Sequence, residues 1–174
     1  MTAADLVGTV MKVSVTNDRI LRRDGRQIPN RYQTDWTIEF VSQVFIRPTF
    51  VGTSYKPRGT SKTPLEGGGL IHLGVPKETR SRGGGDEIWI FDPGVLTFLR
   101  TYEGGAMNAT FAVTRTDAGF ACTAKVSWPK ETGVPTIVLR SFEDNSKIEI
   151  ISAKQSASSC TISKAASDNQ LKKP

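Results

Sequence analysis

Arginine and lysine side chains gather in two stretches of the first half of the sequence. Residues 1–85 hold 13 Lys and Arg against 7 Asp and Glu, which accounts for the whole formal net charge of +6. The two stretches contain Arg19, Arg22, Arg23, Arg26 and Arg31, and then Arg47, Lys56, Arg58 and Lys62. Guanidinium groups bind phosphate and carboxylate well, and a positive patch attracts anions through a long-range field. We expect an anionic ligand, a polyanion or an acidic glycan, to contact these residues on loops.

Aromatic residues interleave with these cations, as they do in an oligonucleotide groove. The residues are Tyr32, Trp36, Phe45, Phe50 and Tyr55. Bases stack on such rings while basic side chains follow the phosphate backbone. Trp36 and Phe45 are better explained as part of a hydrophobic core. Nucleic-acid binding is an alternative function that uses the same basic face.

The two cysteines lie on predicted strands and both point inward. Cys122 alternates with Phe120 and Val126, and Cys160 lies two residues before Ile162. Inward cysteines on separate strands can be bridged if their Cα atoms approach to about 4.4–6.8 Å, and the bridge would contribute about 3–4 kcal/mol. The alternative is a pair of buried free thiols. A disulfide would place the protein in the periplasm or outside the cell, with its leader removed.

His72 is the only histidine, which limits the catalytic chemistry. One histidine and two thiols cannot form an ordinary zinc site, and a serine–histidine–carboxylate triad would have to use His72 without a G-x-S-x-G motif. We expect no metal, no cofactor and no catalytic nucleophile. A carboxylate-based hydrolase is a second alternative, with Asp86, Glu87 and Asp92 around Trp89 as acidic candidates.

Short strands are the elements that would position these residues. Apolar and polar residues alternate over residues 107–114 and 120–128, which Thr116–Gly119 joins into a predicted hairpin. Residues 135–141 and 147–152 predict a second hairpin. Further strands are expected at residues 11–16, 36–46, 70–73, 88–91 and 95–99 and around Cys160. This predicts an all-β, single-domain antiparallel sandwich or barrel of about 8–10 short strands with at most one short helix, for which residues 92–100 are the candidate.

Length and composition agree with one globular domain. The chain has 174 residues, of which 37% are hydrophobic and 23% are charged, and this excludes collagen, a disulfide-dense miniprotein and global disorder. No window holds 18 uncharged apolar residues, so we expect no transmembrane segment. The domain is predicted over 1–163, with long mobile loops at 51–86 and a disordered tail at 164–174.

A resemblance is carried by Gly8–Val15 with the arginines that follow it, by Val44–Arg47, and by the cysteine segments Phe120–Val126 and Ser156–Ile162. These segments resemble exported β-rich proteins of rhizobial α-proteobacteria, a group without an established activity. The resemblance spans most of the chain, which departs from the group in lacking a leader and in its polar C-terminal tail. It implies export and a disulfide, and no mechanism. We therefore expect a secreted or periplasmic, disulfide-bridged β module with a binding or structural role.

Overall fold

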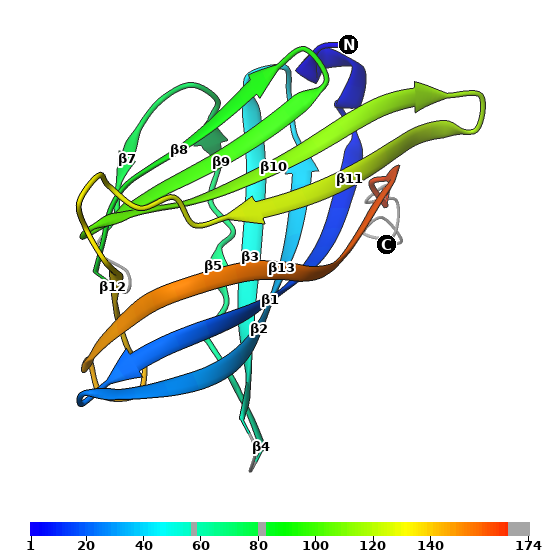
Figure 1. Ribbon diagram of the computed structural model, residues 1–174. Helices are drawn as coiled ribbons and strands as arrows, with labels where there is room; N and C mark the ends of the chain where they lie inside the picture. Colours follow the sequence, from blue (N-terminus) through cyan, green and yellow to red (C-terminus); the bar gives the residue numbers. More distant parts are fainter. Residues whose placement is uncertain (57–58, 80–82, 167–174) are drawn as a thin grey trace, which may run out of the picture.

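Two antiparallel β-sheets make up the computed structural model of the protein, which describes residues 1–56, 59–79 and 83–166 (Figure 1). The larger sheet has the strand order β12-β13-β1-β2-β3-β4, with β5 and β6 also paired to β3. The smaller sheet has the order β11-β10-β9-β8-β7. The larger sheet contains β1 (Thr9–Arg23), β2 (Arg26–Phe40), β3 (Phe45–Lys56), β4 (Gly59–Lys62), β5 (Glu66–Gly67), β6 (Ile71–His72), β12 (Ile137–Arg140) and β13 (Lys147–Lys164). The smaller sheet contains β7 (Lys77–Glu78), β8 (Gly84–Asp92), β9 (Val95–Tyr102), β10 (Gly105–Thr116) and β11 (Gly119–Ser127).

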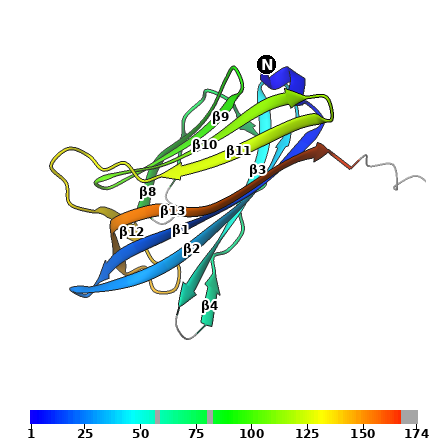
Figure 2. The same cartoon turned by 45° about the vertical axis from the view of Figure 1, so that its right-hand side comes forward.

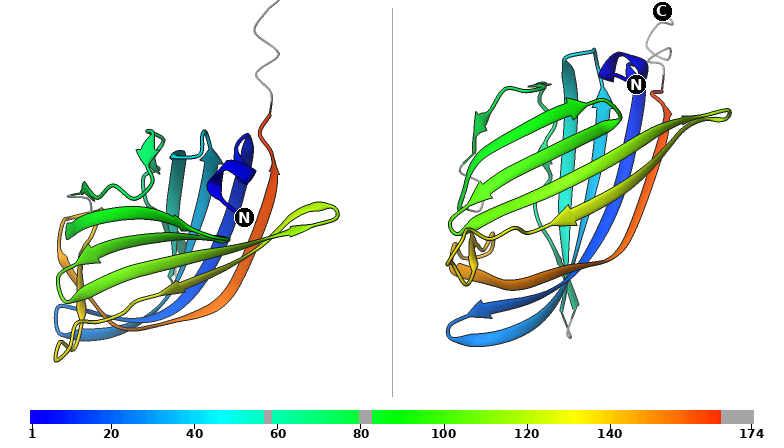
Figure 3. Two further views of the ribbon diagram at one scale, coloured as in Figure 1. Left: turned by 90° about the horizontal axis from the view of Figure 1, so that it is seen from above. Right: turned by 45° about the horizontal axis from the view of Figure 1, so that its top comes forward.

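The larger sheet curls, and the smaller sheet covers part of its concave face (Figure 3). A 3-10 turn at Ala3–Leu6 precedes β1. The end of the β1–β2 hairpin and the strands β3 and β4 extend beyond the smaller sheet, toward the lower part of Figure 1. The predicted all-β fold class is confirmed.

The core lies where the two sheets face each other. Trp36 and Phe40 of β2 meet Trp89, Phe98 and Phe111 of the smaller sheet, and all five side chains are buried. The ring centroids of Trp36 and Phe111 lie 5.6 Å apart in an edge-to-face arrangement, and those of Trp89 and Phe98 lie 4.6 Å apart. Aromatic contacts of this kind add to the free energy gained by removing apolar surface from water.

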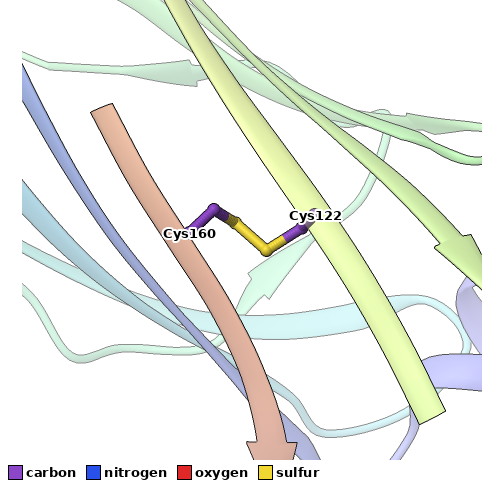
Figure 4. Close-up of a disulfide and its surroundings, with 2 residues drawn as sticks. All are labelled: Cys122 and Cys160. Carbon is purple, nitrogen blue, oxygen red and sulfur yellow. A yellow bond between two sulfur atoms is a disulfide. The ribbon is translucent and has the colours of Figure 1, made fainter. Parts of the chain in front are cut away.

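A disulfide between Cys122 of β11 and Cys160 of β13 joins one edge of the smaller sheet to the larger sheet (Figure 4). The two Cα atoms lie 5.5 Å apart, within the range that such a bridge requires. Along the same seam, where β11 and β13 run side by side (Figure 2), the amide of Gln155 bonds to the β11 backbone. Its Oε1 accepts from Val126 N at 2.7 Å and its Nε2 donates to Ala124 O at 3.0 Å. The predicted bridge is confirmed, and the alternative of two free thiols is wrong.

The basic stretch from Arg19 to Arg31 forms a strand hairpin, and its interpretation as a loop is wrong. β1 and β2 stay paired as far as Arg23 and Arg26, and only Asp24 and Gly25 form the turn. Both turn residues have positive φ, at 50° and 74°. Asp-Gly is a strong signal for a two-residue hairpin turn with positive φ at both positions, so this turn could be predicted from the sequence.

Other boundaries also differ from those predicted. Residues 51–86 are expected to be long mobile loops, but β3 continues to Lys56 and the strands β4 to β8 begin within this range. The mobility of the range stays a prediction. Residues 92–100 form no helix, because Pro93 and Gly94 make a tight turn between β8 and β9. The two strands expected near the C-terminus are one strand, β13. Of the expected tail, residues 167–174 lie outside the described residues.

Candidate functional site

A cavity of about 300 Å³ lies where the β1–β2, β3–β4 and β12–β13 hairpins end. Its apolar lining includes Leu21, Ile28, Pro29, Leu139, Phe142 and Ile148. Amide and hydroxyl side chains also line it, those of Asn30, Ser54, Ser61, Thr63 and Ser141. Its charged lining consists of Arg19, Arg23, Lys56, Lys62 and Glu143. We call this cavity the hairpin pocket. Four cations against one carboxylate give it a positive charge, and its volume is at the lower end of the range for small-molecule sites.

Strand alternation places the pocket residues of the β1–β2 hairpin on one face. Successive side chains of a strand point to opposite sides, so Arg19, Leu21 and Arg23 share the face that lines the pocket. The antiparallel register sets Asn30 opposite Arg19 and Ile28 opposite Leu21. A polar pair and an apolar pair therefore follow each other along the concave face.

Arg19 is held rigidly by side chains from the neighbouring strands, and it is only 4% exposed. Its Nε and Nη2 donate to Asn30 Oδ1 at 3.1 and 2.7 Å, and Asn30 Nδ2 donates to Ser54 Oγ at 2.8 Å. Its Cζ lies 3.9 Å from the centroid of the Tyr32 ring. A buried guanidinium stacked on an aromatic face gains cation–π stabilisation and is fixed in orientation.

The loop at 141–146, between β12 and β13, is tied to the other two hairpins by ion pairs. Lys56 Nζ lies 3.3 Å from Glu143 Oε1, and Arg23 pairs with Asp144. The backbone amide of Ser146 donates to Asp144 Oδ1 at 3.1 Å, and hydrogen bonding by Ser146 is the largest cause that lowers the pKa of Asp144, to about 2. Both carboxylates lie in water, where such pairs are weak one by one, but together they set the position of the loop beside the pocket.

Four of the nine cations predicted to bind an anion meet at the hairpin pocket. These are Arg19 and Arg23 from the first stretch and Lys56 and Lys62 from the second. The remaining described ones do not line it. Arg26 is exposed near the end of the β1–β2 hairpin, and Arg58 lies outside the described residues.

Three further predicted arginines pair with acids away from the hairpin pocket. Arg22 Nε lies 2.6 Å from Glu149 Oε2, Arg31 Nε lies 3.0 Å from Asp18 Oδ1, and Arg47 pairs with Glu39. The hydrogen bond with Arg22 lowers the pKa of Glu149, and the hydrogen bond with Arg31 lowers that of Asp18. Alternation again explains the separation, because Arg22 projects from β1 on the side opposite to Arg19 and Arg23.

The walls supplied by the second half of the chain were not predicted. Leu139, Phe142 and Ile148 belong to the second predicted hairpin, which is confirmed by the pairing of β12 with β13. Their approach to Arg19 depends on β13 lying beside β1, a pairing between distant parts of the sequence. The sequence indicates the β12–β13 hairpin, but it contains no local pattern that predicts its contact with β1.

The acidic candidates for hydrolysis are separate from the hairpin pocket. Glu87 is buried and its Oε2 accepts from Arg100 Nη2 at 2.7 Å, while Glu66 Oε2 lies 3.1 Å from Arg100 Nη1. These three side chains line a second cavity, of about 180 Å³, between β5 and the smaller sheet. Asp86 and Asp92 are exposed. The two glutamates are thus engaged by one arginine that links the sheets.

His72 is exposed, with its Nδ1 2.7 Å from the carbonyl oxygen of Leu73 and its ring against Phe45. Among residues 1–56, 59–79 and 83–166, no three His, Cys, Asp or Glu side chains gather in a group that would hold a metal ion. In the same described part of the chain, no helix has the length and apolar character needed to cross a membrane.

Comparisons with protein-family models, with curated proteins and with solved structures find no match for this chain. The hairpin pocket and its surroundings are therefore the basis on which a function is inferred.

Proposed function

We propose that this protein is an exported binding module that holds a small anionic ligand in the hairpin pocket. The observation that carries the proposal is the convergence of four cations from two distant stretches of sequence on one cavity. Arg19 supplies a fixed charge inside the cavity, and Lys62 an exposed one at its edge. A concave site with a few convergent polar groups is the usual form of a small-molecule site.

The distribution of the other cations favours a small anion over a nucleic acid. A nucleic-acid strand requires positive charge spread along a groove that follows its backbone. Arg22, Arg31 and Arg47 are instead paired with carboxylates outside the pocket. Arg23 and Lys56 also pair with carboxylates, but all four pocket cations lie around one cavity instead of along a groove, which suits a single anionic group.

The proposal is tested by titrating the native protein with the fluorescent sulfonate 8-anilinonaphthalene-1-sulfonate. We expect saturable 1:1 binding that weakens as salt is added, because salt screens exposed charges. Lys62→Glu should weaken binding about fivefold or more, since it reverses a charge at the pocket. Lys12→Glu is the matched control, because Lys12 is exposed on β1 and does not line the hairpin pocket, and the variant has the same net charge.

Two results would reject the proposal. One is the absence of saturable binding to the folded protein. The other is an equal loss of affinity in Lys12→Glu and Lys62→Glu, which would mean that only the net charge matters.

Export is the second part of the proposal, and it is supported by the disulfide and by the resemblance to exported proteins. Disulfides persist in oxidising compartments and are rare in the cytosol. Cells producing the protein from its natural gene can be treated with a thiol-alkylating reagent before lysis. We expect Cys122 and Cys160 to be alkylated only after reduction; labelling without reduction would contradict export.

A further inference from the structure

We infer that the ligand of the hairpin pocket is an amphipathic anion, with an unbranched apolar chain in the cavity and its charged group at the cationic rim. This inference rests on the proposed function and adds the chemical class of the ligand. Two apolar pairs form the walls, Leu21 opposite Ile28 on β1 and β2, and Leu139 opposite Ile148 on β12 and β13. Such walls offer an apolar chain a place out of water, because their side chains form no hydrogen bonds with a ligand.

Apolar side chains are also left in water at this site. Ile28 is 43% exposed and Phe142 is 40% exposed, and both line the pocket. Two exposed lysines line the same cavity, Lys62 and Lys56, the second of which pairs with Glu143. An amphipathic anion satisfies both features at once, because its chain covers the apolar side chains while its charged group stays at the wet, cationic edge.

The volume of the pocket limits the length of the chain. About 300 Å³ accommodates about ten groups of the size of a water molecule, taking about 30 Å³ for each. A medium-length chain therefore fills the cavity, and any further methylene groups would remain in solvent. The expected class is alkyl carboxylates, sulfates or phosphates with up to about ten carbon atoms.

The test is isothermal titration calorimetry with a series of straight-chain carboxylates from butanoate to dodecanoate, each below its micelle-forming concentration. We expect affinity to rise about fourfold for each added methylene, the gain that burial of one such group provides. The rise should level off near decanoate, where the cavity is full. An affinity independent of chain length would overturn the inference.

Neutral and inorganic probes separate the inference from the proposed function. If inorganic phosphate binds at the pocket as tightly as octanoate, anion binding stands and the apolar chain is rejected. If octanol binds as tightly as octanoate, the cations contribute nothing and the proposed anion site is rejected. If neither the carboxylates nor phosphate bind, the inferred ligand class and the proposed anion site are both rejected. The expected result is octanoate binding more tightly than either probe.

A wall variant provides the matched comparison. Ile28→Ser removes exposed apolar surface from the pocket, and we expect it to weaken decanoate binding about tenfold while binding of butanoate changes little. Val75→Ser is the control, because Val75 is 50% exposed and lies outside the pocket. Since both side chains are well exposed, both variants should fold. Equal effects of the two variants on decanoate binding would contradict the inferred position of the chain.

Discussion

The guanidinium of Arg19 lies over the ring of Tyr32, with its Cζ 3.9 Å from the ring centroid, and both side chains are buried. This contact holds a buried positive charge against the larger sheet, at the hairpin pocket. Tyr32 can lie there because the neighbouring residue of β3 is Gly52. A Cβ at position 52 would come within 1.7 Å of the Tyr32 hydroxyl oxygen and within 2.4 Å of its Cζ.

Gly52→Ala should therefore displace Tyr32 and, with it, Arg19. We expect a loss of about 1–3 kcal/mol in the free energy of unfolding, the usual cost of overpacking a buried site, together with weaker anion binding. Gly69→Ala is the control, because a Cβ there meets nothing within 4 Å. Urea denaturation and fluorescence titration measure the two effects. Unchanged stability and affinity in Gly52→Ala would contradict the role given to this contact.

The disulfide should contribute strongly to stability because it joins the two sheets across the seam between β11 and β13. Its cysteines are 38 residues apart in the sequence. The double variant Cys122→Ser with Cys160→Ser should lose about 3–4 kcal/mol of unfolding free energy on the chain-entropy model. Reduction of the wild-type protein should cause a similar loss in urea denaturation. A loss below about 1 kcal/mol would show that Gln155 and the core hold the seam without it.

Arg100 should be the most sensitive charged residue outside the hairpin pocket. It is 3% exposed and pairs with Glu66 and Glu87. Arg100→Met leaves two carboxylates without their partner, and we expect a loss of about 3–5 kcal/mol in unfolding free energy. Adding Glu66→Gln and Glu87→Gln to that variant should recover part of the loss. Failure of the triple variant to gain any stability would contradict this explanation.

The loop at 141–146 should stay in place down to low pH. The pKa of Asp144 is lowered from 3.8 to about 2. Since the folded-state pKa is lower than the unfolded one, the contribution of this carboxylate is complete above pH 3.8 and is lost as the pH falls toward 2. The amide of Ser146, which donates to Asp144 Oδ1, reports this titration by NMR. A midpoint near 3.8 would contradict the expectation, and Asp144→Asn should abolish the titration.

Local patterns in the sequence predicted the fold class, two hairpins and the disulfide. Period-two alternation identifies which side chains face inward. This pattern places both Cys122 and Cys160 on the inward-facing sides of their strands. The Asp24-Gly25 dipeptide indicates a tight hairpin turn just as clearly, although a loop is predicted there. Long arginine side chains on the extended β1–β2 hairpin obscured its alternation, although Arg19 and Leu21 continue the inward face.

The assembly of the hairpin pocket could not be predicted in the same way. It depends on β13 pairing with β1, which brings Ile148 and Leu139 beside Leu21. Nothing local in a single sequence identifies partners so far apart along the chain. The ion pair between Arg22 and Glu149 has the same cause, because these two residues are opposite each other in the pairing of β1 with β13.

NMR of the methyl groups during a decanoate titration tests the central claim most directly. If the chain enters the hairpin pocket, the largest shifts should occur at Leu21, Ile28, Leu139 and Ile148, with contacts from the decanoate chain to these side chains. The apolar hollow near Val44 and Leu73, at the other end of β3, provides the comparison. Shifts concentrated there, or no saturable shifts at all, would contradict the assignment of the hairpin pocket as the binding site.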